Sequence, residues 1–180
     1  DGFEHTSVLN TGKAKERTIL VNSLSKTYAM TGWRIGYTLL PEKYYGDVFK
    51  IHLNVVACAS SFIQKAALEA ITGTDKYLNE MLQIMQERKE LIINELGKIE
   101  SLSFSNPEGA FYVLIDISNT GMRSLDAAEI LLEKYGLVTM PGGFFGKNGD
   151  KYLRFAFAID GKKLIEGVKR FANFYKDYVK

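Results

Sequence analysis

One stretch of the chain decides the fold: Ser23-Leu24-Ser25-Lys26-Thr27-Tyr28-Ala29-Met30-Thr31-Gly32-Trp33-Arg34-Ile35-Gly36. It places a lysine three residues after a serine and eight residues before an arginine. Residues 18–22 before it and residues 36–40 after it are short, apolar and strand-like, and the first run is rich enough in β-branched side chains to predict a buried strand. The lysine segment is therefore expected to connect two strands.

The remaining hydrophobic patterns predict helices and strands in the rest of the chain. Apolar residues recur at helical spacing in residues 61–71, 75–96, 124–135 and 162–178, and Gly73 and Gly136 are the expected C-terminal stops of the first and third of these helices. Residues 110–117 are almost continuously apolar, which predicts a central strand covered on both faces. Residues 137–140 and 152–158 predict two more strands.

A shift in composition near Gly73 predicts a domain boundary. Residues 1–74 are expected to be the end of a larger α/β sheet domain, and residues 75–180 a compact α+β domain that begins with a long helix.

The composition excludes several classes of protein. The 180 residues are 46% hydrophobic, which is enough for a sizeable core, and the net charge of +2 is too small and too dispersed to indicate nucleic acid or membrane surfaces. No apolar run approaches the ~20 residues that span a bilayer. The single cysteine, Cys58, allows no internal disulfide, and His5 and His52 lie too far apart to predict a metal site. We expect a cytoplasmic protein.

The residue types around Lys26 favour covalent chemistry at its amine. A lysine amine condenses with an aldehyde only when it is unprotonated, and partial burial or a nearby guanidinium disfavours the ammonium form. Arg34 supplies a guanidinium, which also pairs bidentately with a phosphate, and Ser23 supplies a hydroxyl for the same phosphate. A single loop lysine is most often a solvated surface side chain, so it is the complete motif that favours the chemical interpretation.

A second candidate site lies on the strand predicted at residues 152–158. Alternation places Arg154 on one face together with Ala156 and Ala158, which leaves the arginine room to project into a cavity. A guanidinium holds a carboxylate flat and bidentate. Taken alone, a strand arginine beside glycines is more typical of a surface ion pair.

Residues 23–36 closely resemble the pyridoxal 5'-phosphate (PLP) attachment site of class I/II (fold type I) aminotransferases. The resemblance continues to the C-terminus, where Pro141, Gly142, Phe145, Gly146 and Arg154 match the Pro-Gly…Phe-Gly…Arg block of that family. It implies an α/β fold in which residues 1–74 end the PLP-binding large domain, a mixed sheet with helices, and residues 75–180 form the small C-terminal α+β domain.

The resemblance also implies roles for single residues. Lys26 forms a Schiff base with PLP and moves a substrate proton, Ser23 and Arg34 anchor the phosphate, and Arg154 binds the substrate carboxylate. Members of the family are roughly twice as long, so the chain corresponds to a C-terminal half and is expected to be inactive by itself. The aspartate and tyrosine that contact the cofactor ring are expected outside it, and a homodimer is expected for the full-length protein.

The motif is most like that of aspartate, aromatic and kynurenine-type aminotransferases. It predicts amino-group transfer between an α-amino acid, with aspartate or an aromatic amino acid as the first candidates, and a 2-oxo acid. One alternative is a carbon–sulfur lyase or an aminocyclopropane-carboxylate synthase, which share Lys26 and Arg154. Another is the aminotransferase-like effector domain of a transcription regulator, although nothing in the +2 chain favours DNA binding.

Overall fold

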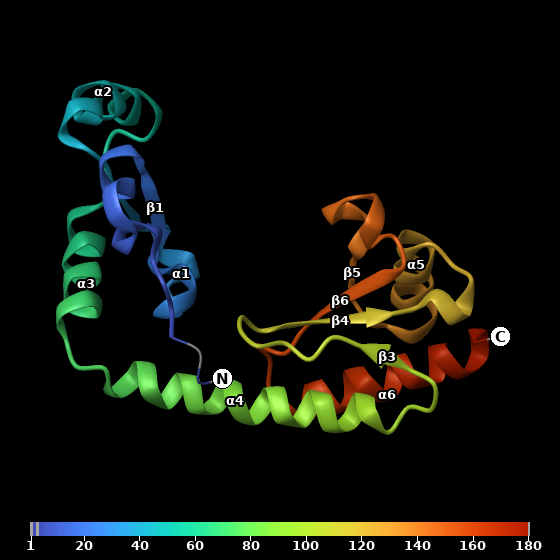
Figure 1. Ribbon diagram of the computed structural model, residues 1–180. Coiled ribbons are helices and arrows are strands. Elements are labelled where there is room, and N and C mark those ends of the chain that lie inside the picture. Colours follow the sequence, from blue (N-terminus) through green and yellow to red (C-terminus); the bar gives the residue numbers. More distant parts are fainter. Residues whose placement is uncertain (1, 3, 180) are drawn as a thin grey trace. The chain divides into compact units, whose positions relative to one another are not determined.

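The chain divides into two units between Glu80 and Met81 in the computed structural model, which describes residue 2 and residues 4–179 (Figure 1). The division falls inside the long helix α4 (Lys76–Gly97), so this helix has residues in both units. Each unit has its own sheet and its own buried cluster. The domain boundary that we expect after residue 74 stays a prediction.

The unit Gly2–Glu80 is built on a two-stranded antiparallel sheet, in which Leu20 lies opposite Leu39 and Ser23 opposite Gly36. Its strands and helices are β1 (Leu20–Ser23), α1 (Leu24–Thr27), β2 (Gly36–Leu39), α2 (Tyr45–Val55) and α3 (Ser61–Thr72), with 3-10 turns η1 (Val8–Asn10), η2 (Gly12–Arg17), η3 (Thr31–Trp33) and η4 (Glu42–Tyr44).

The strands on either side of the lysine segment and the helix α3 were predicted from the sequence and are confirmed, with Gly73 at the C-cap of α3. Helix α2 was not predicted. The prediction that β1 is buried is wrong for the described chain, in which three of its four residues are exposed. The physical reason is that β1 pairs with β2 alone in the part of the chain that the structure describes.

The second unit, from Met81 onward, contains a four-stranded antiparallel sheet with the order β3-β4-β6-β5. The central pair is β4 and β6, in which Leu114 lies opposite Arg154. Its elements after α4 are β3 (Ser103–Phe104), β4 (Tyr112–Asp116), η5 (Ser118–Thr120), α5 (Ser124–Tyr135), β5 (Met140–Pro141), η6 (Gly142–Phe145), η7 (Lys147–Gly149), β6 (Tyr152–Ala156) and α6 (Gly161–Tyr178).

The core of this unit covers one face of the sheet. Figure 1 shows α6 alongside the C-terminal part of α4, and both helices join α5 in packing on the odd-numbered side chains of β4 and β6. Leu114, on the opposite face, stays 39% exposed. The core contains Ile92 and Leu96 of α4, Ala127 and Leu131 of α5, Leu164, Val168, Phe171, Phe174 and Tyr175 of α6, and Val113, Ile115, Leu153 and Phe155 of the sheet.

The expected central position of residues 110–117 is therefore confirmed, but the expectation that both faces are covered is wrong. Within this unit the three helices share one face, and no described helix of the unit covers the other face, which carries Arg154. The predicted ends of α5 and α6 agree with the structure within one residue. Gly136 caps α5 in the left-handed conformation, with φ of 62°, which glycine adopts without strain.

Candidate functional site

Lys26 lies on α1, a single helical turn that starts directly after β1. The Ser23 hydroxyl caps this turn by accepting a hydrogen bond of 3.1 Å from the Ser25 N–H. Leu24 and Met30, on either side of Lys26, are buried and pack on Ala67 of α3, while Lys26 itself is exposed. The chain is thus anchored before and after the lysine, while Lys26 itself is exposed.

Arg34 follows the turn η3 and stands in the left-handed backbone conformation with φ of 53°, as does Ala29. A non-glycine residue pays roughly 1–2 kcal/mol for this conformation, and such strain is concentrated at functional sites. The guanidinium of Arg34 is exposed and donates a hydrogen bond of 2.9 Å to the Thr31 carbonyl oxygen. The local fold therefore holds Arg34 at the surface in one particular turn.

The pairing of β1 with β2 brings Ser23, Lys26 and Arg34 to the same end of the small sheet. Ser23 lies opposite Gly36, and the Leu24 N–H donates to the Ile35 carbonyl oxygen at 3.3 Å, next to Arg34. The close approach needs glycine, because a Cβ at Gly36 would stand 2.4 Å from the Asn22 carbonyl oxygen. Ser23, Lys26 and Arg34 supply a hydroxyl, an amine and a guanidinium, and these group types can bind a phosphate ester that carries an aldehyde, so the residues fit PLP.

Arg154 belongs to the other unit, on β6. It lies on the open face of the sheet, next to Leu114 of β4 and Met140 of β5. Its guanidinium carbon lies 4.3 Å from the centre of the Tyr112 ring and 4.8 Å from that of the Phe145 ring. A pocket of about 220 Å³ adjoins it, lined by Leu114, Gly142, Phe145, Gly149, Tyr152 and Arg154.

The glycine-rich loop at residues 142–149 is fixed by close backbone contact at its two ends. A Cβ at Gly142 would lie 2.3 Å from the Gly149 carbonyl oxygen, and one at Gly149 would lie 2.1 Å from that of Gly142. A residue with a side chain at either position would push the backbone at Gly142 away from the backbone at Gly149, so the two glycines allow the ends of the loop to meet.

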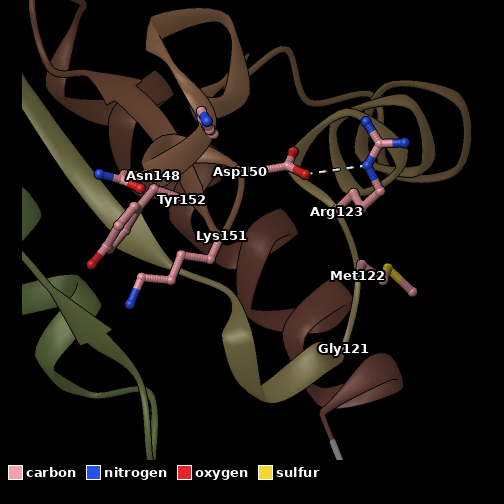
Figure 2. A pocket seen from close by; sticks show the side chains of 8 residues that line it. Gly121, Met122, Arg123, Asn148, Asp150, Lys151 and Tyr152 are labelled. Carbon is pink, nitrogen blue, oxygen red and sulfur yellow. Dashed lines mark hydrogen bonds and ion pairs between the residues drawn. The ribbon is translucent and has the colours of Figure 1, made fainter.

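A polar network ties the same loop to the start of α5. The buried Ser124 hydroxyl donates to Asp150 Oδ1 at 2.9 Å and accepts from the Gly143 N–H at 3.0 Å. Asp150 also pairs with Arg123 at 3.2 Å (Figure 2). The Ser124 hydrogen bond, and next to it that of Arg123, hold the pKa of the Asp150 carboxyl below its usual value. The carboxylate therefore stays charged at neutral pH and keeps both partners.

The pocket beside this network, of about 670 Å³, is a weaker candidate for an anion site (Figure 2). Of its three cations, Arg123 pairs with Asp150, and Lys151 lies 3.9 Å from Asp116.

No group of three or more histidine, cysteine, aspartate or glutamate side chains among the described residues is arranged to hold a metal ion. Within the same residues, no helix has the length and apolar character of a membrane span.

The structure thus groups three of the four predicted site residues, Ser23, Lys26 and Arg34, and places Arg154 in the other unit. The sequence did not predict a role beside Arg154 for Tyr112, Ser124, Phe145 or Asp150. Phe145 and Asp150 stood in the segment singled out around Arg154, but their partners lie far away in the chain, so no local signal assigned them a role.

Comparison of sequences shows extensive similarity to aminotransferases. The family described as aminotransferase class I and II matches residues 2–171. The aspartate aminotransferase of Pyrococcus horikoshii is 40% identical over 159 residues, which are 87% of this chain and 41% of that protein. Aromatic-amino-acid aminotransferase 2 of Thermococcus litoralis is 32% identical in an alignment of 182 positions, which covers 98% of this chain and 46% of that protein.

Comparison of structures gives the same result. The crystal structure of an aromatic aminotransferase from Pyrococcus horikoshii matches 98% of this chain and 48% of its own length, with a TM-score of 0.92 and 34% identity. This likeness confirms the α/β fold class that we expect from the sequence. The chain spans less than half the length of these relatives.

Proposed function

Because the chain belongs to the aminotransferase class I and II family, we propose that the protein containing it transfers an amino group between an α-amino acid and a 2-oxo acid with PLP as cofactor. The observation that carries the proposal is the exposed Lys26, anchored between Ser23 and Arg34 at one end of the β1–β2 sheet. The family is PLP-dependent. When bound, PLP supplies an aldehyde for a covalent link to an amine and a ring that takes up electrons from the substrate.

Different residues of the chain have separate roles in binding and in proton transfer. Arg34 and Ser23 would hold the phosphate of PLP, because a guanidinium and a hydroxyl both donate hydrogen bonds to phosphate oxygens. Lys26 would supply the amine for the covalent link to PLP, and the same amine would hold and move the proton of the substrate Cα. Arg154 binds the substrate α-carboxylate and thereby orients the Cα proton.

The names of the relatives support aspartate or an aromatic amino acid as donor, because proteins named for both lie among them. These names also favour an aminotransferase over the lyase and the regulator considered from the sequence. We include a homodimer in the proposal, since the family is typically dimeric. A cytoplasmic location is also part of it, supported by the lone free Cys58.

The test is a visible absorption spectrum of the full-length protein with PLP, before and after addition of aspartate or phenylalanine. We expect an absorption band that differs from that of free PLP and that changes with one of the donors. Lys26→Ala should remove this band. Lys65→Ala, which changes an exposed lysine on α3, is the matched control. Borohydride reduction followed by peptide mass analysis should locate the cofactor on Lys26. If an absorption band distinct from that of free PLP survives in Lys26→Ala, the proposed attachment is refuted.

A further inference from the structure

The guanidinium of Arg154 is held by aromatic rings rather than by hydrogen bonds. Its Cζ lies within the ~6 Å range of cation–π attraction for both Tyr112 and Phe145. Among the described residues, its N–H groups donate to no acceptor, and it forms no ion pair. Contact through a ring face uses none of the five N–H donors, so all of them stay available to a ligand.

Tyr112 reaches Arg154 diagonally across the sheet. In the register of β4 and β6, Leu114 lies directly opposite Arg154 and Tyr112 lies opposite Ala156, two residues further along. A diagonal neighbour on an antiparallel sheet is within reach of an aromatic or long side chain. The Tyr112 ring is therefore placed by the sheet itself.

Phe145 reaches Arg154 from the loop at residues 142–149. Phe145 is 60% exposed and takes no part in the core of the unit, so core packing does not account for its position. The neighbouring Phe144 is 67% exposed, and the cation–π contacts of Arg154 among the described residues are with Tyr112 and Phe145. The bonds that Ser124 makes to Gly143 and Asp150 hold this loop, and with it the Phe145 ring.

We propose that Phe145 is a positioning residue, which with Tyr112 forms an aromatic bracket that holds the Arg154 guanidinium ready for a carboxylate. The inference rests on the proposed role of Arg154. An unrestrained arginine loses side-chain freedom when it binds, and a guanidinium already held against two rings loses less. The bracket therefore strengthens carboxylate binding by holding the guanidinium in place.

The test compares Phe145→Leu with Phe144→Leu in the full-length protein loaded with PLP. The probes are 2-methylaspartate and α-methylphenylalanine, which carry the α-carboxylate but no Cα proton, so calorimetry measures binding without turnover. The loss of one exposed cation–π contact predicts a dissociation constant about two- to fivefold higher for Phe145→Leu. Phe144→Leu should bind as the unchanged protein does, and Phe145→Tyr, which keeps a ring, should restore the dissociation constant.

A spectroscopic readout reports the bracket directly. Because the face of an aromatic ring shields nearby protons, the NMR signals of the Arg154 side chain should move downfield in Phe145→Leu and stay in place in Phe144→Leu. Both replaced rings are exposed, so both variants should keep the melting temperature. Unmoved Arg154 signals in Phe145→Leu would overturn the proposal, as would a Phe145→Tyr variant that binds as weakly as Phe145→Leu.

Arg154→Lys separates this inference from the proposed function. It keeps the charge but loses the planar bidentate group, so it should weaken probe binding more than Phe145→Leu does. If Arg154→Lys binds the probes normally, the proposed role of Arg154 is wrong and the bracket with it. If Arg154→Lys binds weakly but Phe145→Leu matches Phe144→Leu, the bracket alone is wrong.

Discussion

Replacing Ser124 by alanine should loosen the loop at residues 142–149. The Ser124 side chain is fully buried, and its hydroxyl joins the Asp150 carboxylate to the Gly143 N–H. Alanine fills nearly the same space but accepts and donates nothing. The Gly143 N–H then has to find water, which it reaches most easily when the loop opens.

The size of the effect follows from the bond that is lost. A hydrogen bond between neutral groups contributes about 1 kcal/mol net, and this corresponds to an opening of the loop about fivefold more frequent. The Asp150 carboxylate adds little to this figure, because its side chain is 37% exposed and water replaces the hydroxyl there.

Hydrogen exchange followed by mass spectrometry measures this opening. In the full-length protein, a peptide covering residues 142–149 should exchange roughly fivefold faster in Ser124→Ala. Thr139→Val is the matched control, because the Thr139 hydroxyl is buried and has no hydrogen-bond partner among the described residues. Its removal should leave exchange unchanged or slow it. Equal exchange in Ser124→Ala and the unchanged protein would refute the proposed anchor.

Two further predictions concern pH and the glycine contact. A hydrogen bond to Asp177 raises the pKa of Tyr135 to about 12, so the folded state holds this proton more tightly than the unfolded chain, whose tyrosines titrate near ~10. This stabilisation of the folded state is present below about pH 10 and is lost as the pH rises to 12. Tyr135→Phe should therefore flatten the change in folded fraction that circular dichroism follows in this pH window. An unchanged titration in Tyr135→Phe would contradict the prediction. Gly142→Ala places a Cβ 2.3 Å from the Gly149 carbonyl oxygen and should lower the melting temperature and weaken binding of the α-methyl probes, whereas Gly161→Ala, with 3.5 Å to Leu91, should do neither.

Elements with local signals could be predicted from the sequence. Glycine ends both helices, and the end of each helix agrees with the prediction within one residue. Gly136 adopts the left-handed C-cap conformation, whereas Gly73 is extended and leaves space for the Glu69 carbonyl oxygen, which a Cβ would meet. The coverage of β4 could not be predicted in this way. Its even-numbered residues Tyr112 and Leu114 are apolar although they face the open side, so continuous apolarity did not reveal that all three helices pack on the other side.

The candidate site residues of the two units differ in how much of their surroundings a sequence motif contains. Ser23, Lys26 and Arg34 lie within one short segment that folds back through a single strand pair. Most of the residues around them therefore belong to the same sequence motif. The surroundings of Arg154 are assembled from β4, the start of α5 and the loop before β6. No contiguous motif contains these parts.

This difference has a consequence for substitutions outside the motifs. A change near Lys26 acts within its own segment, whereas the orientation of Arg154 depends on Tyr112, Ser124, Phe145 and Asp150, which come from separate elements. Relatives with the same lysine segment can therefore differ in how firmly they hold a carboxylate. Substitutions that tune substrate binding without altering the attachment of PLP should accordingly concentrate around Arg154, on the loop and strand that build its bracket.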